Sequence, residues 1–268
     1  MADWREGLRR GDLQHPSLRA RIRGGERLLG TFVKSRDPLI SEALAVAGYD
    51  FVVADLEHSA LSVGDAEGIV RACDGYDVPV IARIPASGLA LCGALLDAGV
   101  TGIQVSDVSS AESAAATRAA AHYPPAGERS LSLSTRAARF GAVPAARHVP
   151  ASLEQTVLIG QIESPSGLAA LPDIIKSGVF DALFFGPTDL SAALGHPGQA
   201  GHPDVADALL EAAGVITDSG TPLGIFCASA GEARHWGERG LTLLVIGTDL
   251  TMLRGAASAT LGELRTRG

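Results

Sequence analysis

The sequence predicts an α/β fold in which a single (β/α)8 barrel follows a short N-terminal extension. Short runs rich in Val, Ile, Leu and Phe alternate with longer Ala- and Leu-rich segments of helical period. There are eight such pairs, and eight β/α units are what a closed parallel barrel requires. A chain of 268 residues also suits one barrel domain spanning residues 1–268.

The elements follow one another in order along the chain. The expected strands are residues 29–33, 51–55, 79–83, 102–105, 157–162, 182–185, 222–227 and 243–246. The expected helices are residues 39–47, 63–73, 89–98, 111–122, 167–177, 204–218, 231–239 and 252–265. A doubly wound open sheet is the alternative, but the first strand–helix turn lacks the GxGxxG fingerprint of a dinucleotide site. We therefore predict closure into a TIM barrel.

Two segments lie outside this alternation. Residues 1–28 precede the first strand, and we expect this extension to form a short helix over the barrel floor. Residues 124–156 begin with two prolines, contain four arginines and are too long for an ordinary connection. Because long loops in compact domains tend to carry function, we expect this stretch to fold over the active-site face.

Composition argues against several classes of partner. The net charge is −8 and there is no run of basic residues, so the electrostatic footprint of a nucleic-acid or acidic-membrane binder is missing. The polar N-terminus lacks the apolar stretch of a secretory signal, and no apolar run has transmembrane length. We expect a cytoplasmic protein whose partners are small molecules, with no nucleic acid and no membrane.

Polar side chains gather where five of the expected strands end, and in a parallel barrel these ends form the active-site face. They are Asp55, Glu57 and His58 at the end of the second strand, Arg83 at the end of the third, Gln161 and Glu163 at the end of the fifth, Thr188 and Asp189 after the sixth, and Cys227 at the end of the seventh. Side chains alternate along a strand, so Asp55 and Glu57 share one face, as do Gln161 and Glu163. Both pairs can converge on one site.

Several carboxylates at the mouth of an aliphatic barrel are costly to bring together unless a cation neutralises them. Oxygen ligands favour Mg²⁺ or Mn²⁺ over zinc, and two protein carboxylates leave positions open for water and substrate. The alternative is a set of ordinary solvated loop acids paired with loop arginines. The agreement of five strand ends favours a metal site.

Residues 188–195 have the pattern of a short helix that begins at a capping residue, Thr188, and stops at Gly195. The N-terminus of this helix would face the site, and its free N–H groups would seat a substrate carboxylate. Simple capping of a loop helix is the alternative.

Eight short motifs run from end to end of the chain. They are Gly48-Tyr49-Asp50, Asp55-Leu56-Glu57-His58, Arg83, Leu96-Asp97-Ala98-Gly99, Tyr123-Pro124-Pro125-Ala126-Gly127-Glu128-Arg129, Gln161-Ile162-Glu163, Gly186-Pro187-Thr188-Asp189-Leu190-Ser191 and Gly247-Thr248-Asp249. Each motif alone is weak, but together they are specific. With them the chain resembles the HpcH/HpaI aldolase family, the metal-dependent pyruvate aldolases that include 4-hydroxy-2-oxoheptanedioate and 2-keto-3-deoxy-sugar-acid enzymes.

The resemblance implies a class II aldolase, a carbon–carbon lyase that reversibly cleaves a 4-hydroxy-2-oxo acid to pyruvate or a related 2-oxo acid and an aldehyde. It implies that Glu163 and Asp189 ligate Mg²⁺, Mn²⁺ or Co²⁺, and that Asp55 and Glu57 hold the waters of this metal. The metal would be the cofactor, without PLP, a nucleotide or a Schiff-base lysine. A homo-oligomer, in the family a hexamer, is also implied.

The resemblance assigns the remaining roles as well. His58, oriented by Asp97, would be the acid–base, and Arg83 would stabilise the enolate oxygen as charge develops on it. The substrate would contact five residues in all: Arg83, Gln161, Gly186, Pro187 and Thr188.

Two departures from the family pattern concern the second substrate. The chain has Arg129-Ser130-Leu131-Ser132 where such enzymes commonly have Arg-Gly-x-Gly, and Val105-Ser106-Asp107 where they commonly have Val-Pro. Both segments are expected where the aldehyde should lie. The identity of the aldehyde therefore stays open.

Two other functions are compatible with a barrel of this kind. A citramalyl-CoA-lyase-like enzyme would act on a CoA thioester, but the only candidates for gripping its phosphates are Arg129, Arg136 and Arg139. A non-catalytic binding barrel is the other alternative, and the intact set of polar strand-end residues argues against it.

The lysine count argues against a covalent imine. The chain has two lysines, and Lys176 lies at the end of an expected helix, where it favours the helix dipole and faces solvent. Lys34 follows the first strand and could lie near the mouth, but the negative charge of the acid-rich site would keep its amine protonated and unreactive.

Overall fold

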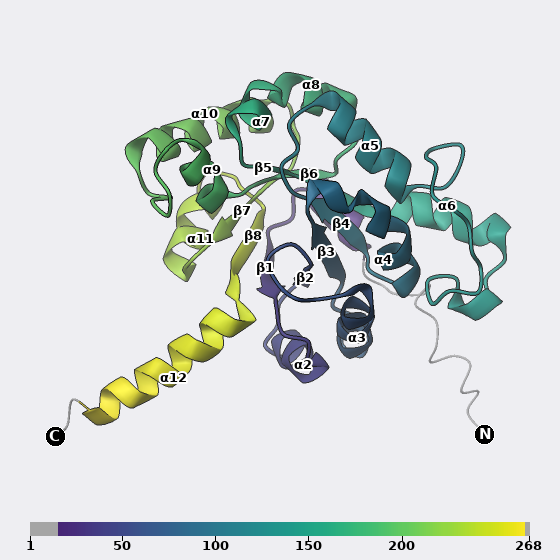
Figure 1. Cartoon of the computed structure of the whole chain (residues 1–268), viewed down its shortest axis with the longest axis horizontal. Coiled ribbons are helices and arrows are strands. Elements are labelled where there is room, and N and C mark those ends of the chain that lie inside the picture. Colours follow the sequence, from purple (N-terminus) through teal and green to yellow (C-terminus); the bar gives the residue numbers. More distant parts are fainter. Residues whose placement is uncertain (1–15, 266–268) are drawn as a thin grey trace.

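Eight parallel strands close into a ring in chain order in the computed structural model, which describes residues 16–265 (Figure 1). The strands are β1 (Leu28–Val33), β2 (Phe51–Asp55), β3 (Val80–Ile84), β4 (Gly102–Val105), β5 (Val157–Ile162), β6 (Ala182–Phe185), β7 (Leu223–Cys227) and β8 (Leu243–Thr248). The predicted (β/α)8 TIM barrel is therefore confirmed. Strands β2, β4, β5 and β6 have the predicted bounds, and the others differ by one or two residues at an end.

Helices surround the ring. They are α1 (Leu18–Arg23), α2 (Pro38–Val46), α3 (Val63–Asp74), η2 (Ala86–Leu91), α4 (Cys92–Ala98), α5 (Ala111–Ala121), η3 (Arg139–Gly141), α6 (Ala145–Gln155), α7 (Pro165–Ala169), α8 (Leu171–Ser177), α9 (Pro187–Ala193), α10 (Pro203–Asp218), α11 (Ala230–Gly237) and α12 (Asp249–Arg265). The helix expected at residues 167–177 is divided into α7 and α8. Pro172 lies in the first turn of α8, where a missing N–H costs nothing, so a new helix begins there.

Every second residue of the strands points into the barrel and fills it. One buried cluster holds these side chains together with two from α1: Leu18, Ile22, Leu28, Phe32, Phe51, Val53, Ile81, Val157, Ile159, Ala182, Phe184, Leu243 and Val245. A larger buried cluster joins the outward faces of the strands to the helices. Continued towards the C-terminal ends of the strands, the inward series becomes polar.

Helix α1 closes the N-terminal end of the barrel. Leu18 and Ile22 are buried in the interior cluster. Arg19 and Arg23 pair with the buried carboxylate of Asp181 at 2.8 and 2.7 Å. The expected floor helix is therefore present, whereas residues 1–15 of the extension lie outside the described residues.

The long segment at residues 124–156 lies at the opposite end of the barrel from the one predicted. Helix α5 ends and β5 begins at the N-terminal end of the barrel, so the connection between them starts and finishes there. Arg136 pairs with Asp74 at the end of α3, and Arg19 of α1 donates to the carbonyl of Leu153. The prediction that this segment covers the active-site face is wrong, because it is a helix-to-strand connection and only strand-to-helix loops build that face.

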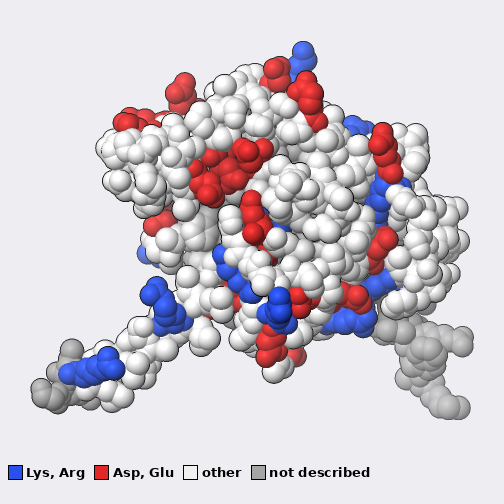
Figure 2. All heavy atoms as spheres, viewed as in Figure 1, with Lys and Arg blue, Asp and Glu red and all other residues white. Residues whose placement is uncertain are grey.

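Helix α12 projects away from the barrel (Figure 1). Asp249, its first residue, is buried, and four of its leucines are between 49% and 70% exposed: Leu250, Leu253, Leu261 and Leu264. Among residues 16–265, no helix is both long enough and apolar enough to cross a membrane. On the face drawn in Figure 2, the blue Lys and Arg side chains form no continuous stripe.

Candidate active site

A cavity of about 260 Å³ opens at the C-terminal ends of the strands. Its walls come from most of the strands and the loops that follow them: Phe32, Lys34, His58, Arg83, Gln161, Phe184, Gly186, Pro187, Thr188, Asp189, Phe226 and Thr248. The cavity therefore lies at the barrel end where active sites form, and it gathers most of the residues expected from the sequence.

Arg83 and Asp55 form a buried ion pair between β3 and β2. Arg83 Nε and Nη2 donate to the two carboxylate oxygens of Asp55 at 3.0 and 2.8 Å, which is the paired geometry that suits a guanidinium. The ring of Phe32 lies 4.1 Å from the Arg83 Cζ, and the Glu57 carboxylate is 3.5 Å from Nε. These contacts fix the guanidinium at the cavity wall.

Asp55 is also bound by a second cation and by the loop after β2. Lys34 Nζ lies 3.1 Å from Asp55 Oδ2, and the backbone N–H groups of Glu57 and His58 donate to Oδ1 at 3.2 and 3.1 Å. Burial raises the pKa of the Asp55 carboxyl, but Arg83, the His58 N–H and Lys34 together hold this pKa below its usual range. Asp55 is therefore an ionised anchor rather than a proton donor.

Glu163 lies in a different electrostatic environment. The Gln161 side-chain amide donates to Glu163 Oε2, and the backbone N–H of Asp107 donates to Oε1 at 3.0 Å. Burial, together with the negative charges of Asp189 and Glu57, raises the pKa of Glu163 to about 7 in spite of these hydrogen bonds. A nearby cation would offset these negative charges and favour the ionised form of Glu163.

His58 stands at the rim of the cavity with half of its side chain exposed. Its Nε2 is 3.8 Å from Glu57 Oε2 and 4.0 Å from Asp189 Oδ2. The Ser106 hydroxyl donates to Glu57 Oε1 at 2.5 Å, but Glu57 Oε2 is buried and has no hydrogen-bond partner within residues 16–265. One imidazole and three carboxylates, those of Glu57, Glu163 and Asp189, thus converge from β2, β5 and the turn after β6.

The turn between β6 and α9 brings Asp189 to this point. Gly186, not Thr188, is the N-cap of α9, and Pro187 occupies the first turn. The expected capping by Thr188 is therefore wrong, and Pro187 has no N–H to offer a carboxylate. A Cβ on Gly186 would overlap Glu163 Oε2, so only glycine lets the turn approach Glu163 this closely.

Asp97 is not brought to the cavity. It lies in the last turn of α4, which runs back to the N-terminal end of the barrel, and the Arg129 guanidinium donates to its carboxylate at 2.5 Å. The expectation that Asp97 orients His58 is therefore wrong within this chain. Arg129 is buried at the same place, so it does not occupy the aldehyde position expected for it either.

Sequence reasoning missed part of the cavity's hydrogen-bond network. Gln104 on β4 donates to Gln161 Oε1 at 2.6 Å, and Ser106 binds Glu57. The sequence predicts an unreactive Lys34 near the mouth of the cavity, but it does not predict the contact of Lys34 with Asp55. The two-residue period could have identified all three, because residues 102, 104 and 106 point inward on β4, and Lys34 continues the inward series of Phe32.

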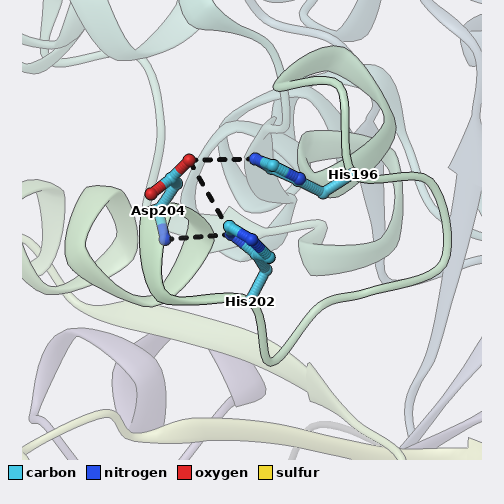
Figure 3. Close-up of side chains that lie close together, drawn as sticks. All are labelled: His196, His202 and Asp204. Carbon is cyan, nitrogen blue, oxygen red and sulfur yellow. Dashed lines mark hydrogen bonds and ion pairs between the residues drawn. The ribbon is translucent and has the colours of Figure 1, made fainter.

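A second group of titratable side chains lies between α9 and the start of α10 (Figure 3). His196 Nε2 is 2.9 Å from Asp204 Oδ2, His202 Nδ1 is 3.8 Å from the same oxygen, and the two rings stack with their centres 3.5 Å apart. His202 Nδ1 also accepts the Asp204 N–H and so caps α10. In parallel stacked rings the in-plane lone pairs lie in separate planes, so they cannot both point at one ion in this arrangement.

The fold and the cavity together define a class: a barrel enzyme whose strand ends hold a carboxylate-rich site with one arginine and one histidine. Residues 28–256 match the family model described as HpcH/HpaI aldolase/citrate lyase. The chain belongs to this family and is a carbon–carbon lyase of the aldolase type.

Relatives extend over most of the chain. A hydroxypyruvate/pyruvate aldolase of Delftia acidovorans is 34% identical over 249 residues, which cover 92% of each protein. A 5-keto-4-deoxy-D-glucarate aldolase of Klebsiella pneumoniae is 33% identical over 85% of this chain and 88% of its own. The crystal structure of an HpcH/HpaI aldolase/citrate lyase family protein from Burkholderia cenocepacia superposes with a TM-score of 0.87 at 32% identity, covering 92% of this chain and 98% of that one.

Proposed function

We propose that the protein is a divalent-metal-dependent aldolase that reversibly cleaves a 4-hydroxy-2-oxo acid to pyruvate, or a related 2-oxo acid, and an aldehyde. The observation that carries this proposal is that Arg83, His58 and Asp189 line one small cavity. Glu57 and Glu163 lie directly behind it, against the lining residues Arg83 and Gln161. The relatives named as pyruvate, hydroxypyruvate and keto-deoxy-glucarate aldolases support the substrate class.

The residues present fit a divalent cation. Glu163 and Asp189 are the proposed ligands. The raised pKa of Glu163 marks a place that lacks positive charge, and the buried Glu57 Oε2, 3.5 Å from Arg83 Nε, accepts no hydrogen bond from residues 16–265. Hard oxygen donors favour Mg²⁺, Mn²⁺ or Co²⁺. Of the two acids expected to hold metal-bound water, Glu57 fits better, because both Asp55 oxygens already accept hydrogen bonds. When bound, the cation supplies Lewis-acid stabilisation at the substrate carbonyl.

Arg83 is assigned to the oxyanion that develops when the carbon–carbon bond breaks. Arg83 is 7% exposed, and Asp55 and Phe32 hold its guanidinium in place, so its positive charge is already positioned before the substrate binds. Gln161 and the turn at residues 186–188 line the same cavity and are assigned to the 2-oxo acid, with Pro187 contributing packing alone.

His58 is assigned to the proton of the C4 hydroxyl. It stands at the rim, between the buried Arg83 end of the cavity and solvent, where the aldehyde half would leave. During cleavage His58, or a water that it orients, takes the hydroxyl proton, and during addition it returns the proton.

The arginines considered for a CoA substrate do not support that alternative. Arg129 pairs with Asp97 and Arg136 with Asp74, both at the floor end of the barrel, and Arg139 lies in η3 of the same segment. None of the three lines the cavity.

The proposal is tested by removing the metal. After treatment with EDTA, deuterium exchange into the methyl group of pyruvate should stop, and Mg²⁺, Mn²⁺ or Co²⁺ should restore it. Glu163→Gln should weaken Mn²⁺ binding about 10- to 100-fold, whereas Glu211→Gln, at an exposed carboxylate on α10, should not. If a verified metal-free preparation shows full exchange, the proposed metal dependence is wrong. If the metal-loaded protein shows no exchange, the assignment of pyruvate as a substrate is wrong.

We also propose that the chain assembles into a homo-oligomer through α12. Most of the stability of a helix in a protein comes from the packing of its apolar face, yet the 17-residue helix α12 leaves Leu253 and Leu264 62% and 70% exposed. Helix α2 exposes Leu39 and Val46 to 67% and 66%, which offers a second copy a matching apolar surface. Light scattering should give a mass well above 27.4 kDa, and Leu253→Glu with Leu264→Glu should lower it. A monomeric wild-type protein would contradict this proposal.

A further inference from the structure

Lys34 makes two specific contacts at the cavity wall. Its Nζ lies 3.1 Å from Asp55 Oδ2 and donates to the backbone carbonyl of His58 at 3.2 Å. The side chain is 25% exposed, and it lines the cavity together with His58 and Arg83. One ammonium therefore joins the end of β1 to the carboxylate that binds Arg83 and to the loop that carries His58.

The backbone that carries Lys34 is anchored. The Asp249 carboxylate accepts the N–H of Lys34 at 3.0 and 3.1 Å and that of Ser35 at 2.8 Å. Asp249 is itself 5% exposed at the junction of β8 and α12. The end of β1 is thus held by a buried carboxylate from the start of α12, which directly follows the neighbouring strand β8, and this leaves the side chain of Lys34 as the flexible part of the link.

Charge counting shows what the contact with Asp55 does. Two carboxylates lie against the buried Arg83 guanidinium: that of Asp55, at 3.0 and 2.8 Å, and that of Glu57, 3.5 Å from Nε. Without Lys34 these two acids would outweigh the single positive charge of Arg83, whereas Lys34 on Asp55 brings two positive charges against the two negative ones. Arg83 then keeps positive potential towards the cavity, where substrate charge is expected to develop.

The contact with the His58 carbonyl completes a clamp on the loop after β2. The Asp55 carboxylate accepts the N–H groups of Glu57 and His58, and Lys34 binds the carbonyl of His58. The loop is therefore held by an acceptor, the Asp55 carboxylate, and by a donor, the Lys34 ammonium, and these two groups are paired with each other. Removing a positioning group of this kind typically lowers activity about 10- to 100-fold.

We propose that Lys34 is a positioning residue for the aldolase reaction: it clamps the His58 loop and helps to balance the negative charges of Asp55 and Glu57, so that Arg83 keeps a positive potential towards the cavity. The proposal rests on the proposed function in assigning roles to His58 and Arg83. It assigns Lys34 no covalent step.

The test compares Lys34→Met with Lys176→Met, which removes the other lysine of the chain from the last turn of α8. With Mn²⁺ bound, Lys34→Met should lower kcat for aldol cleavage about 10- to 100-fold, with a smaller change in KM. Hydrogen exchange at the amides of Glu57 and His58 should become at least about tenfold faster, because the clamp is lost. Lys176→Met should match the wild type in both measurements.

A rescue experiment separates the ammonium from mere packing. Lys34→Cys treated with 2-bromoethylamine regains an amine of nearly lysine length, and the native thiols of Cys73, Cys92 and Cys227 are all buried and so protected. Alkylation should restore most of kcat and slow the amide exchange.

The outcomes separate this inference from the proposed function. A wild-type kcat in Lys34→Met, unchanged amide exchange, or failure of the amine to rescue would each overturn the role of Lys34. If the wild-type protein does not act on 2-oxo acids, the proposed function fails, and the amide exchange still decides whether Lys34 holds the loop.

Discussion

Glu163 and Asp55 are both buried carboxyls that contact residues of the cavity wall, and their neighbours move their pKa values in opposite directions. Arg83 and Lys34 lower the pKa of Asp55, whereas burial and two neighbouring carboxylates raise that of Glu163 to about 7. The difference separates a permanent anchor from a group that needs a cation. Residue identity alone could not distinguish them, because both are single acids at the end of a strand.

The raised pKa of Glu163 predicts how stability and metal affinity depend on pH. Between pH 4.5 and about 7 the folded metal-free protein keeps a proton that the unfolded chain has lost. Its stability should therefore fall as pH rises through this range, by about 3 kcal/mol from this group. Mn²⁺ affinity should rise over the same range, because binding displaces the proton. Denaturant unfolding in EDTA and Mn²⁺ titrations would measure both slopes.

The control for this pH dependence is Glu163→Gln, which should flatten the stability slope between pH 4.5 and 7. An unchanged slope in that variant would assign the titration to another group.

Substitution of Arg83 and substitution of His58 should impair different steps of the reaction. Arg83→Ala should nearly abolish deuterium exchange into pyruvate, by about 100-fold or more, because the developing oxyanion loses its fixed positive partner. His58→Ala should retain more exchange but lose aldol cleavage, since it serves the C4 hydroxyl. Both reactions can be followed by proton NMR on the same samples. Equal losses in both reactions for both variants would show that the roles are misplaced.

Lys34 should form no imine with pyruvate. Its ammonium is paired with Asp55 and with the His58 carbonyl, and a nucleophile needs a free amine. Borohydride added with pyruvate should leave the mass and the activity unchanged. A reduced adduct on Lys34 with proportional loss of activity would overturn the metal mechanism.

At the scale of single elements, strands were easier to predict than turns. The strands are short apolar runs with an inward series of period two. That period also predicts Arg83 and Gln161 at the strand ends, where they line the cavity, and Glu163 lies against Gln161. The cap of α9 was not predictable in the same way: Thr188 is a good capping residue, but the chain turns at Gly186 because of the space that Glu163 needs.

The turn at Gly186 can be tested directly. Gly186→Ala places a Cβ against Glu163 Oε2 and the Gln161 amide, so Glu163 must shift and Mn²⁺ affinity should fall about 10- to 100-fold. Gly201→Ala is the matched control, because a Cβ there meets nothing within 4 Å. Isothermal titration of both variants would compare them. Wild-type affinity in Gly186→Ala would mean that the turn can give way.

At the scale of the whole molecule, the alternation of elements was enough to predict closure of the barrel, but not the end at which each insertion lies. The segment at residues 124–156 was misplaced because length and composition say nothing about direction. Its position follows from chain order, since it joins a helix to the next strand. The same reasoning places Asp97 at the floor end, at the end of α4, although its motif suggested otherwise.

The floor helix α1 leaves the cavity with one exit, and this has a consequence for the order in which the products leave. Leu18 and Ile22 seal the lower end, so both products must pass the same mouth. Gln161 and Arg83 lie deep, at 1% and 7% exposure, while His58 is at the rim. The aldehyde should therefore depart first and the 2-oxo acid last. In steady-state cleavage assays, pyruvate should inhibit competitively against the aldol substrate and the aldehyde noncompetitively; the reverse pattern would mean that the deep end empties first.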